Sequence, residues 1–228
     1  MSLKAEREGE VLTLVLDRPE KAHAYNRDML LALDKALSGP TPKVIVMAST
    51  GSGAFCAGAD LNEMKEARPE DARELLSQAV FDRLARLPAV SIAAIQGPAV
   101  AGGFELALAC DLRVAGPQAT FSLPEVSLGL IPSAGGCSRL PELVGRSRAH
   151  QIILGGQVLT AEEAQSWGLV ASIHSDPLQE ALNMANRIAA YDSGALKMAK
   201  AVLRGDESDR LELERLAQTV LYDRKNTR

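Results

Sequence analysis

The sequence predicts an α/β protein in which most strands pair in parallel. Short apolar segments rich in β-branched residues alternate with longer segments whose apolar residues recur at helical spacing. Two of the short segments, residues 43–48 and 90–95, are apolar almost without interruption, which is typical of strands buried on both faces of a sheet. The repeated order of strand, helix and strand favours parallel pairing through helical crossovers.

The N-terminal part of the chain supplies a strand, a helix and a second strand. Residues 11–16 form a β-rich run that ends at the turn Asp17-Arg18-Pro19. Asn26 is a suitable helix N-cap, and Gly39-Pro40 stops the helix that follows. The apolar positions of this helix are Met29, Leu30, Leu33 and Leu37. Residues 43–48 then form a buried strand.

The same alternation continues to the C-terminus. A glycine-rich loop spans residues 51–58, a helix is expected over residues 70–87, and Pro88 ends it. Strand 90–95 leads into a helix that begins at Gly102.

Two later strands are expected at residues 112–115 and 169–173. From Leu178 onward the chain is helical and strongly charged. The apolar contacts of this last part are Leu211, Leu213, Leu216 and Val220.

Length and charge limit the classes of protein to consider. The 228 residues suggest one domain, or one domain with an appendage. The net charge of −4, with both signs spread along the chain, argues against a nucleic-acid partner. No apolar run approaches the roughly 20 residues of a membrane span. The charged N-terminus lacks the apolar stretch of a signal peptide, so we expect a cytoplasmic protein.

Cysteine and histidine give no sign of a disulfide framework or a metal site. The three cysteines are odd in number and widely spaced, and each is expected to be a small buried residue: Cys56, Cys110 and Cys137. The three histidines lack the spacing of metal ligands: His23, His150 and His174. The dinucleotide, P-loop and Gly-x-Ser-x-Gly motifs are absent.

Glu105 is the most informative residue, because it is the one acid in the apolar segment 99–110. Burying an ionised carboxylate without partners costs several kcal/mol, so such groups are usually paired, protonated or used in chemistry. Gly102-Gly103, separated from Glu105 by Phe104 in the same segment, opens a helix whose first N–H groups are unpaired and open to a ligand. The segment alone leaves two alternatives open, a structural salt-bridged glutamate and a catalytic one.

Glu125 is a second acid in a largely apolar stretch, residues 121–132, although this segment alone favours an exposed turn position after Pro124. Two half-buried carboxylates in one pocket are able to act as base and acid in adding water across a double bond. Two backbone N–H groups aimed at a carbonyl would stabilise the enolate that forms. Gly102 supplies one such donor, and the loop around Gly58 is the natural source of the other.

With these residues the chain resembles the enoyl-CoA hydratase/isomerase (crotonase) superfamily, closest to the enoyl-CoA hydratases, over nearly its whole length. The resemblance is specific because several motifs occur in the family's order and spacing. They are residues 18–22, 55–61, 97–106, 121–136 and 159–170, and the third reads Gly-Pro-Ala-Val-Ala-Gly-Gly-Phe-Glu-Leu.

The resemblance implies a role for each site residue. Ala59 and Gly102 would donate the oxyanion-hole N–H groups to the thioester carbonyl. Glu105 would help to activate water, and Glu125 would deliver the proton to the α-carbon. Family members that isomerise double bonds often keep one of these acids, so the presence of both favours hydration of a 2-enoyl-CoA.

The resemblance also implies a coenzyme A site and an acyl pocket. The residues expected to cradle CoA are Lys21, Ala22, His23, Ala24, Ala57, Ala59, Asp60 and Leu61. His23 replaces a small polar residue, and packing of its ring is a slightly better explanation than contact with CoA. Ser133 replaces a glycine common in hydratases, in the loop that lines the acyl pocket. No cofactor or metal is expected, since the CoA thioester is itself the substrate.

By resemblance, residues 1–175 form a spiral core of repeated strand-strand-helix turns, and residues 176–228 form a helical trimerisation segment shorter than is usual in the family. A homotrimer or a homohexamer is expected. Two alternatives stay open: an isomerase or other acyl-CoA lyase or hydrolase of the same superfamily, and a non-catalytic relative that binds acyl-CoA or RNA.

Overall fold

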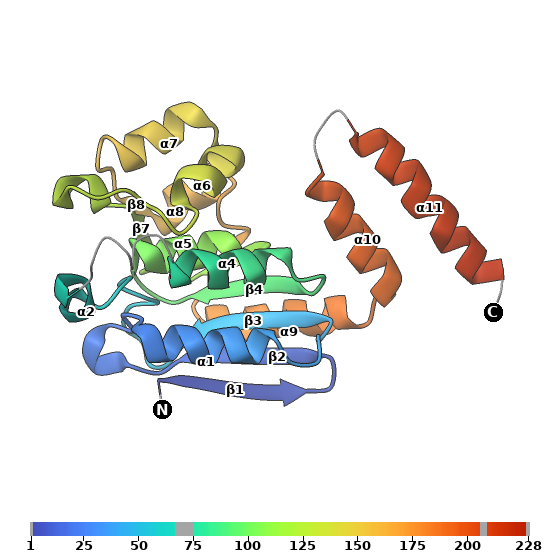
Figure 1. Ribbon diagram of the computed structural model, residues 1–228, viewed down its shortest axis with the longest axis horizontal. Helices are drawn as coiled ribbons and strands as arrows, with labels where there is room; N and C mark the ends of the chain where they lie inside the picture. Colours follow the sequence, from blue (N-terminus) through green and yellow to red (C-terminus); the bar gives the residue numbers. More distant parts are fainter. Residues whose placement is uncertain (1, 67–74, 206–208, 227–228) are drawn as a thin grey trace.

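The computed structural model describes residues 2–66, 75–205 and 209–226, and its centre is a mixed sheet covered by helices (Figure 1). The sheet has the strand order β1-β2-β3-β4-β6-β9. All neighbours pair in parallel except β1 and β2, which form an antiparallel hairpin. The strands are β1 (Leu3–Glu8), β2 (Val11–Leu16), β3 (Val44–Ser49), β4 (Val90–Ile95), β6 (Leu112–Ala115) and β9 (Ser172–Ile173).

Both faces of the central strands β3 and β4 are buried, as the apolar runs predict. All six residues of β3 are buried, and alternate residues belong to different sides. Ile45 and Met47 join the larger core under α1 (Arg27–Leu37) and α4 (Leu76–Arg86). Val44 and Val46 join a smaller core under α9 (Pro177–Ala189). A strand between two apolar layers has no solvent face, so its sequence does not alternate.

A second, three-stranded sheet contacts α5 (Gly102–Ala109) through β5. It consists of β5 (Ala99–Val100), β7 (Thr120–Ser122) and β8 (Leu159–Thr160). β5 pairs in parallel with β7, and β7 pairs antiparallel with β8. The remaining elements are η1 (Pro19–Lys21), α2 (Leu61–Glu66), η2 (Glu125–Leu128), α6 (Gly136–Val144), α7 (Arg146–Ile153), α8 (Ala161–Ser166), α10 (Ser193–Leu203) and α11 (Arg210–Asn226).

Most predicted elements are confirmed, with differences at the edges. Asn26 caps α1 by accepting a hydrogen bond from the Met29 amide at 3.0 Å. The helix expected over 70–87 is confirmed as α4, while residues 70–74 lie outside the described residues. The strand expected over 169–173 shortens to β9. The prediction missed β1, because as an edge strand it buries only its first residue and its sequence is charged.

The C-terminal segment is helical, as predicted, and its last two helices differ from its first. α9 covers one face of the sheet, whereas α10 and α11 stand beside the sheet as a hairpin (Figure 1). Within the described ranges, no helix combines the length and the apolar character needed to cross a membrane. The division of the chain at residue 175 stays a prediction.

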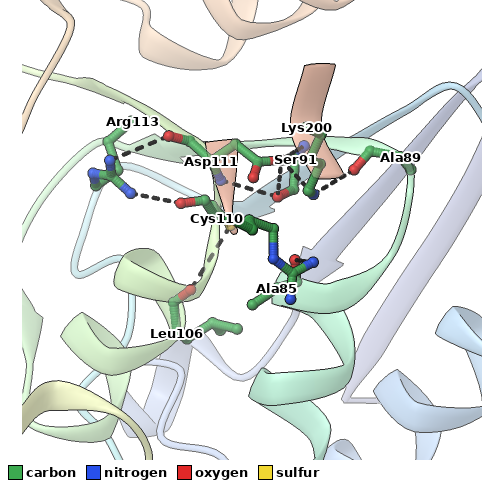
Figure 2. A network of polar contacts seen from close by, with 9 residues as sticks. Ala85, Ala89, Ser91, Leu106, Cys110, Asp111, Arg113 and Lys200 are labelled. Atoms are coloured by element: carbon green, nitrogen blue, oxygen red, sulfur yellow. Dashed lines mark hydrogen bonds and ion pairs between the residues drawn. The ribbon is translucent and has the colours of Figure 1, made fainter. Parts of the chain in front are cut away.

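A buried lysine attaches α10 to the rest of the fold (Figure 2). Lys200 Nζ donates to the Ala89 carbonyl at 2.7 Å and to Asp111 Oδ2 at 2.6 Å. The same carboxylate oxygen accepts from the Ser91 amide at 2.8 Å and the Ser91 hydroxyl at 3.0 Å. Each partner satisfies the others, which is the condition under which a buried ion pair is tolerated.

A second buried cation, Arg113, satisfies the C-terminal end of α5 (Figure 2). Its Nη1 donates to the carbonyls of Ala107 at 3.1 Å and Cys110 at 2.7 Å, and its Nε donates to Leu169 at 2.7 Å. The last carbonyls of a helix lack intrahelical partners and carry partial negative charge, so a guanidinium suits this position. Arg113 thereby fixes the helix whose N-terminal end carries Glu105.

Candidate active site

The site begins at the N-terminal end of α5, where the backbone is unusual. All eight residues of α5 are buried, which suits a helix that is apolar on every side. Ala101, directly before it, has φ 52° and ψ −130°, and its N–H donates to the Ser122 carbonyl at 2.9 Å. A positive φ at a residue with a side chain is strained. The strain turns the peptide that carries the Gly102 N–H.

The glycine-rich loop meets this helix end at van der Waals distance. A Cβ on Gly58, whose φ is +95°, would lie 3.1 Å from the Gly102 nitrogen and 3.0 Å from the Ala101 Cβ. A Cβ on Gly103 would overlap the Cys56 carbonyl. Glycine is therefore required on both sides of the contact, and residues 56–59 lie against the start of α5.

Ala59 is held beside Gly102 by backbone bonds of its neighbours. The Tyr25 amide donates to the Gly58 carbonyl at 2.8 Å, and the Asp60 amide donates to the Tyr25 carbonyl at 2.9 Å. In the part of the chain that the structure describes, no backbone carbonyl accepts from the Ala59 or Gly102 N–H. Two unpaired donors on adjoining segments are the arrangement that an oxyanion hole requires.

Glu105 is buried and is held by a loop at the start of α6. The residue is 3% exposed. Its Oε1 accepts from the amides of Ala134 at 2.7 Å and Gly136 at 2.8 Å. Burial raises the pKa of Glu105 to about 7; the two backbone N–H groups oppose this rise, and the charge of Glu125 adds to it. Near neutral pH this carboxyl is therefore poised between its two forms, as a general base requires.

Glu125 lies at the start of η2 and is buried, so the alternative of an exposed turn residue is excluded. Burial raises its pKa. Its Oε2 is buried with no hydrogen-bond partner among the described residues. A buried polar atom without a partner is unusual and calls for an explanation. The two acids from α5 and η2 are near enough for the charge of Glu125 to act on Glu105.

Tyr25 completes one wall of the site, and sequence reasoning missed it. A Cβ on Gly102 would overlap the Tyr25 hydroxyl. Burial and the charge of Glu105 both raise the pKa of this phenol, so it is neutral at ordinary pH. Its ring packs edge-on against Phe81 of α4, with centroids 5.6 Å apart. A single tyrosine between two loops forms no local pattern that would have identified it.

The loop before Tyr25 carries half of the predicted CoA residues and folds through two left-handed residues, Ala22 and His23. The His23 ring is buried; its Nδ1 accepts from the Arg18 amide at 3.1 Å, and its Nε2 lies 3.0 Å from the Thr50 carbonyl. The ring therefore packs, the alternative that the sequence favours. Lys21 and Ala22 are exposed.

Arg18 joins this loop to the second predicted CoA segment, another role that sequence reasoning missed. Its Nη1 donates to the Ala24 carbonyl at 2.7 Å, and its Nη2 pairs with Asp60 Oδ2 at 3.0 Å. The Ala57 amide donates to the Ala22 carbonyl at 3.0 Å. The structure thus brings residues 21–24 and 57–61 together beside the unpaired Ala59 N–H, although nothing in it tests contact with CoA.

Ser133 lies near a cavity of about 260 Å³ between α4 and α6. Gln78 Nε2 donates to the Ser133 carbonyl at 2.7 Å, and the following residue, Ala134, binds Glu105. The cavity is lined by Leu75, Gln78, Ala79, Asp82, Arg86, Gly135, Ser138 and Arg139. Neither catalytic candidate lines it. The proximity of Ser133 is compatible with its predicted place at an acyl pocket, which stays a prediction.

One expectation about cysteine was wrong. Cys56 and Cys110 are buried, but Cys137 is exposed, although its thiol lies near enough to Glu105 and Glu125 for their charges to add to the effect of desolvation, which raises its pKa. His150 and His174 are exposed. Among the residues that the structure describes, no histidine, cysteine and acidic side chains are grouped to hold a metal ion.

Comparison with known proteins gives consistent matches over the whole chain. The family model described as "Enoyl-CoA hydratase/isomerase" matches residues 6–227. A short-chain-enoyl-CoA hydratase of Clostridium acetobutylicum is 38% identical over 213 residues, which are 90% of this chain and 82% of that protein.

Two solved structures have the same fold. An enoyl-CoA hydratase from Bacillus anthracis superposes with a TM-score of 0.90 at 31% identity, over 96% of this chain and 90% of that one. A putative enoyl-CoA hydratase from Thermobifida fusca, solved in complex with CoA, superposes with a TM-score of 0.90 at 28% identity, over 100% of this chain and 95% of that one.

Proposed function

Since the chain belongs to the enoyl-CoA hydratase/isomerase family, we propose that it is an enoyl-CoA hydratase. The reaction is the reversible addition of water to a 2-enoyl-CoA thioester. One observation carries the proposal: two buried carboxylates from different elements, Glu105 and Glu125, share a site beside two unpaired backbone N–H groups. An isomerase needs to move one proton between carbons, whereas hydration uses a base and an acid at separate atoms.

The proposed chemistry assigns a task to each group. Ionised Glu105 accepts a proton from water as the water oxygen bonds to C3 of the enoyl group. The C2–C3 π electrons move toward the thioester, and the N–H groups of Ala59 and Gly102 hold the resulting enolate oxygen. Protonated Glu125 then delivers its proton to C2, which gives the 3-hydroxyacyl thioester. Loss of one oxyanion donor typically costs about 10²–10³-fold in rate. Each step moves only protons and substrate electrons, so the proposal includes no cofactor.

We place coenzyme A along the two joined loops. The residues proposed to contact it are Lys21, Ala22, His23, Ala24, Ala57, Ala59, Asp60 and Leu61. Support comes from the hydrogen bonds that join the loops and from the CoA complex of the Thermobifida fusca relative. His23 would contribute through its position in the loop, since its ring is buried. Ser133 is proposed to line the acyl pocket.

We propose that the protein is cytoplasmic. We also propose that it assembles as a homotrimer or a homohexamer through its C-terminal helices.

The support for the assembly is a set of exposed apolar side chains on α10 and α11: Leu203, Leu211, Leu216, Val220 and Tyr222. Apolar surface of this kind is usually covered by a partner. Sedimentation of the wild-type chain and of Leu211→Glu tests it, and a monomeric wild type would contradict the assembly.

Incubation with crotonyl-CoA tests the activity. The conjugated enoyl-thioester absorbance should fall as 3-hydroxybutyryl-CoA forms. Glu105→Gln and Glu125→Gln should each lower kcat by about 10²–10⁴-fold, because each removes one positioned proton transfer. CoA binding, measured by calorimetry, should survive in both variants. Full hydration by either variant would refute the two-acid mechanism, and formation of a 3-enoyl product would instead identify an isomerase.

A further inference from the structure

The loop that holds Glu105 is itself held from the side away from the acid. Residues 133–136 present the Ala134 and Gly136 amides to Glu105 Oε1. On the outer side, Arg139 Nη1 donates to the Ala134 carbonyl at 3.0 Å. The same peptide segment is therefore bonded to Glu105 by its N–H and to Arg139 by its carbonyl.

The fit between Arg139 and the loop is close. A Cβ on Gly135, whose φ is +116°, would overlap the Arg139 guanidinium. The side chain of Arg139 is 17% exposed, so its charge is largely withdrawn from water. A guanidinium packed on Gly135 and bonded to the Ala134 carbonyl at 3.0 Å leaves residues 133–136 little freedom to turn their amides away from Glu105.

The far side of the guanidinium is attached to α4. Arg139 Nη2 lies 3.4 Å from Asp82 Oδ1, and Asp82 Oδ2 accepts from Arg86 Nε at 2.5 Å. Asp82 is 42% exposed, which makes its pairs weak as sources of stability. The value of this contact is geometric, since it gives the guanidinium a second acceptor in addition to the Ala134 carbonyl.

We propose that Arg139, oriented by Asp82, is a positioning residue that keeps the loop 133–136 turned toward Glu105 and so keeps this base aimed in the hydration reaction. The inference rests on the proposed function of Glu105. Arg139 touches neither of the two acids by a hydrogen bond, so its action passes through the loop and through its charge.

Several groups set the charge state of Glu105 together with Arg139. From α6, the positive charge of Arg139 lowers the pKa of Glu105, as do the amides of Gly136 and Ala134. From η2, the charge of Glu125 raises it. Two neutral groups also face it, the Tyr25 phenol and the Cys137 thiol of α6, whose own pKa values the charge of Glu105 raises. Arg139 is thus the cation that opposes burial and Glu125.

The test compares four variants of the full-length protein. Arg139→Gln removes the charge and the clamp, Arg139→Lys keeps the charge, and Asp82→Asn frees the guanidinium. Arg83→Gln is the matched control. Arg83 lies next to Asp82 on α4 and pairs with another aspartate, Asp34, at 2.8 Å, away from the loop 133–136. The readouts are kcat and KM for crotonyl-CoA against pH, and an infrared titration of Glu105. That titration follows the carboxylic-acid carbonyl band that disappears in Glu105→Gln.

In Arg139→Gln the acid limb of kcat should move to higher pH, because an opposite charge near Glu105 is lost. At pH 7, kcat should fall by about 10- to 100-fold with little change in KM, since a displaced base affects the chemical step. Arg139→Lys should restore most of the acid limb and only part of kcat. Asp82→Asn should lower kcat less than Arg139→Gln does. The double variant Asp82→Asn/Arg139→Gln should have the same kcat as Arg139→Gln alone, because both substitutions remove the same contact. Arg83→Gln should match the wild type.

A purely structural role would give a different result. If Arg139→Gln lowers the melting temperature but leaves both the acid limb and the infrared titration of Glu105 unchanged, the positioning role is wrong. The infrared titration needs no substrate, so it decides this inference even if the wild type fails to hydrate crotonyl-CoA. A shifted titration in Arg139→Gln with an inactive wild type would refute the proposed function and keep the electrostatic link.

Discussion

Glu105 and Glu125 share one site, but the protein holds them in opposite ways. Glu105 projects from a helix buried along its whole length, and two backbone amides bind one of its oxygens. Glu125 begins a short 3₁₀ turn, and its Oε2 is buried without a partner in the described part of the chain. The first acid is anchored to the scaffold, whereas the second has an oxygen left open.

This difference teaches how one site can keep a base and an acid apart. Hydrogen bonds from two N–H groups favour the ionised form of Glu105 against the effect of burial. Burial is the largest influence on the pKa of both acids and raises both, so the two acids differ in their hydrogen bonds rather than in their burial. An anchored base and an acid with an oxygen left open are two partners that hydration is able to use.

The largest expected contrast is in stability, because deletion of the two side chains leaves different groups behind. Glu105→Ala leaves the Ala134 and Gly136 amides buried without an acceptor and opens a cavity beside them. An unsatisfied buried donor costs about 1–3 kcal/mol, so the total loss should be about 4 kcal/mol. Glu125→Ala removes an oxygen that has no partner and should cost about 1 kcal/mol.

Urea denaturation at pH 5 and fixed protein concentration measures this contrast, since Glu105 is mostly protonated there and assembly is held constant. Glu142→Ala, an exposed acid on α6, is the control and should change little. Equal losses for the two site variants would break the distinction between an anchored and an unanchored acid.

The second expected effect concerns pH. The pKa of Glu105 rises from 4.5 to about 7 on folding, so between these values the native state binds more protons than the unfolded state. This contribution to the free energy of unfolding is fully present below pH 4.5 and is lost as pH rises toward 7. At about 1.4 kcal/mol per unit of pKa shift, the loss should be roughly 3–4 kcal/mol.

Glu105→Gln removes this titration while an amide oxygen can still accept from the loop. The difference in unfolding free energy between variant and wild type should therefore grow in favour of the variant from pH 5 to pH 8. Chemical denaturation at several pH values measures it. A constant difference over this range would show that Glu105 titrates normally in the folded protein.

Sequence reasoning succeeded where a residue contrasts with its neighbours. β3 and β4 were predictable because apolar runs without alternation indicate burial on both faces, and Glu105 was recognisable as one acid in such a run. The small sheet was missed because β5 and β8 have two residues each, too few to show a period. Short strands of this kind are fixed by pairing partners far away in the chain.

The supporting residues of the site were missed for the same physical reason. Tyr25, Arg18 and Arg139 act through contacts with residues that lie well separated in sequence, such as Gly102 for Tyr25 and Asp82 for Arg139. None of them stands out from its local surroundings. The two acids were found by their unfavourable context, while the groups that make that context tolerable became visible only when the chain was folded.

The smallest expected effect tests whether the two acids influence each other. The charge of Glu125 raises the pKa of Glu105, so Glu125→Gln should lower the pKa of Glu105 toward its ordinary value by less than one unit. The infrared titration of Glu105 measures this shift without turnover, and Glu142→Gln serves as a matched acid-to-amide control outside the site.

A lowered pKa of Glu105 in Glu125→Gln would mean that loss of Glu125 also makes Glu105 a weaker base. The combined loss of activity in Glu105→Gln/Glu125→Gln should then be smaller than the product of the losses in the two single variants. An unchanged titration would mean that Glu125 is already protonated when Glu105 ionises, which would make the two acids independent and assign the raised pKa of Glu105 to burial alone.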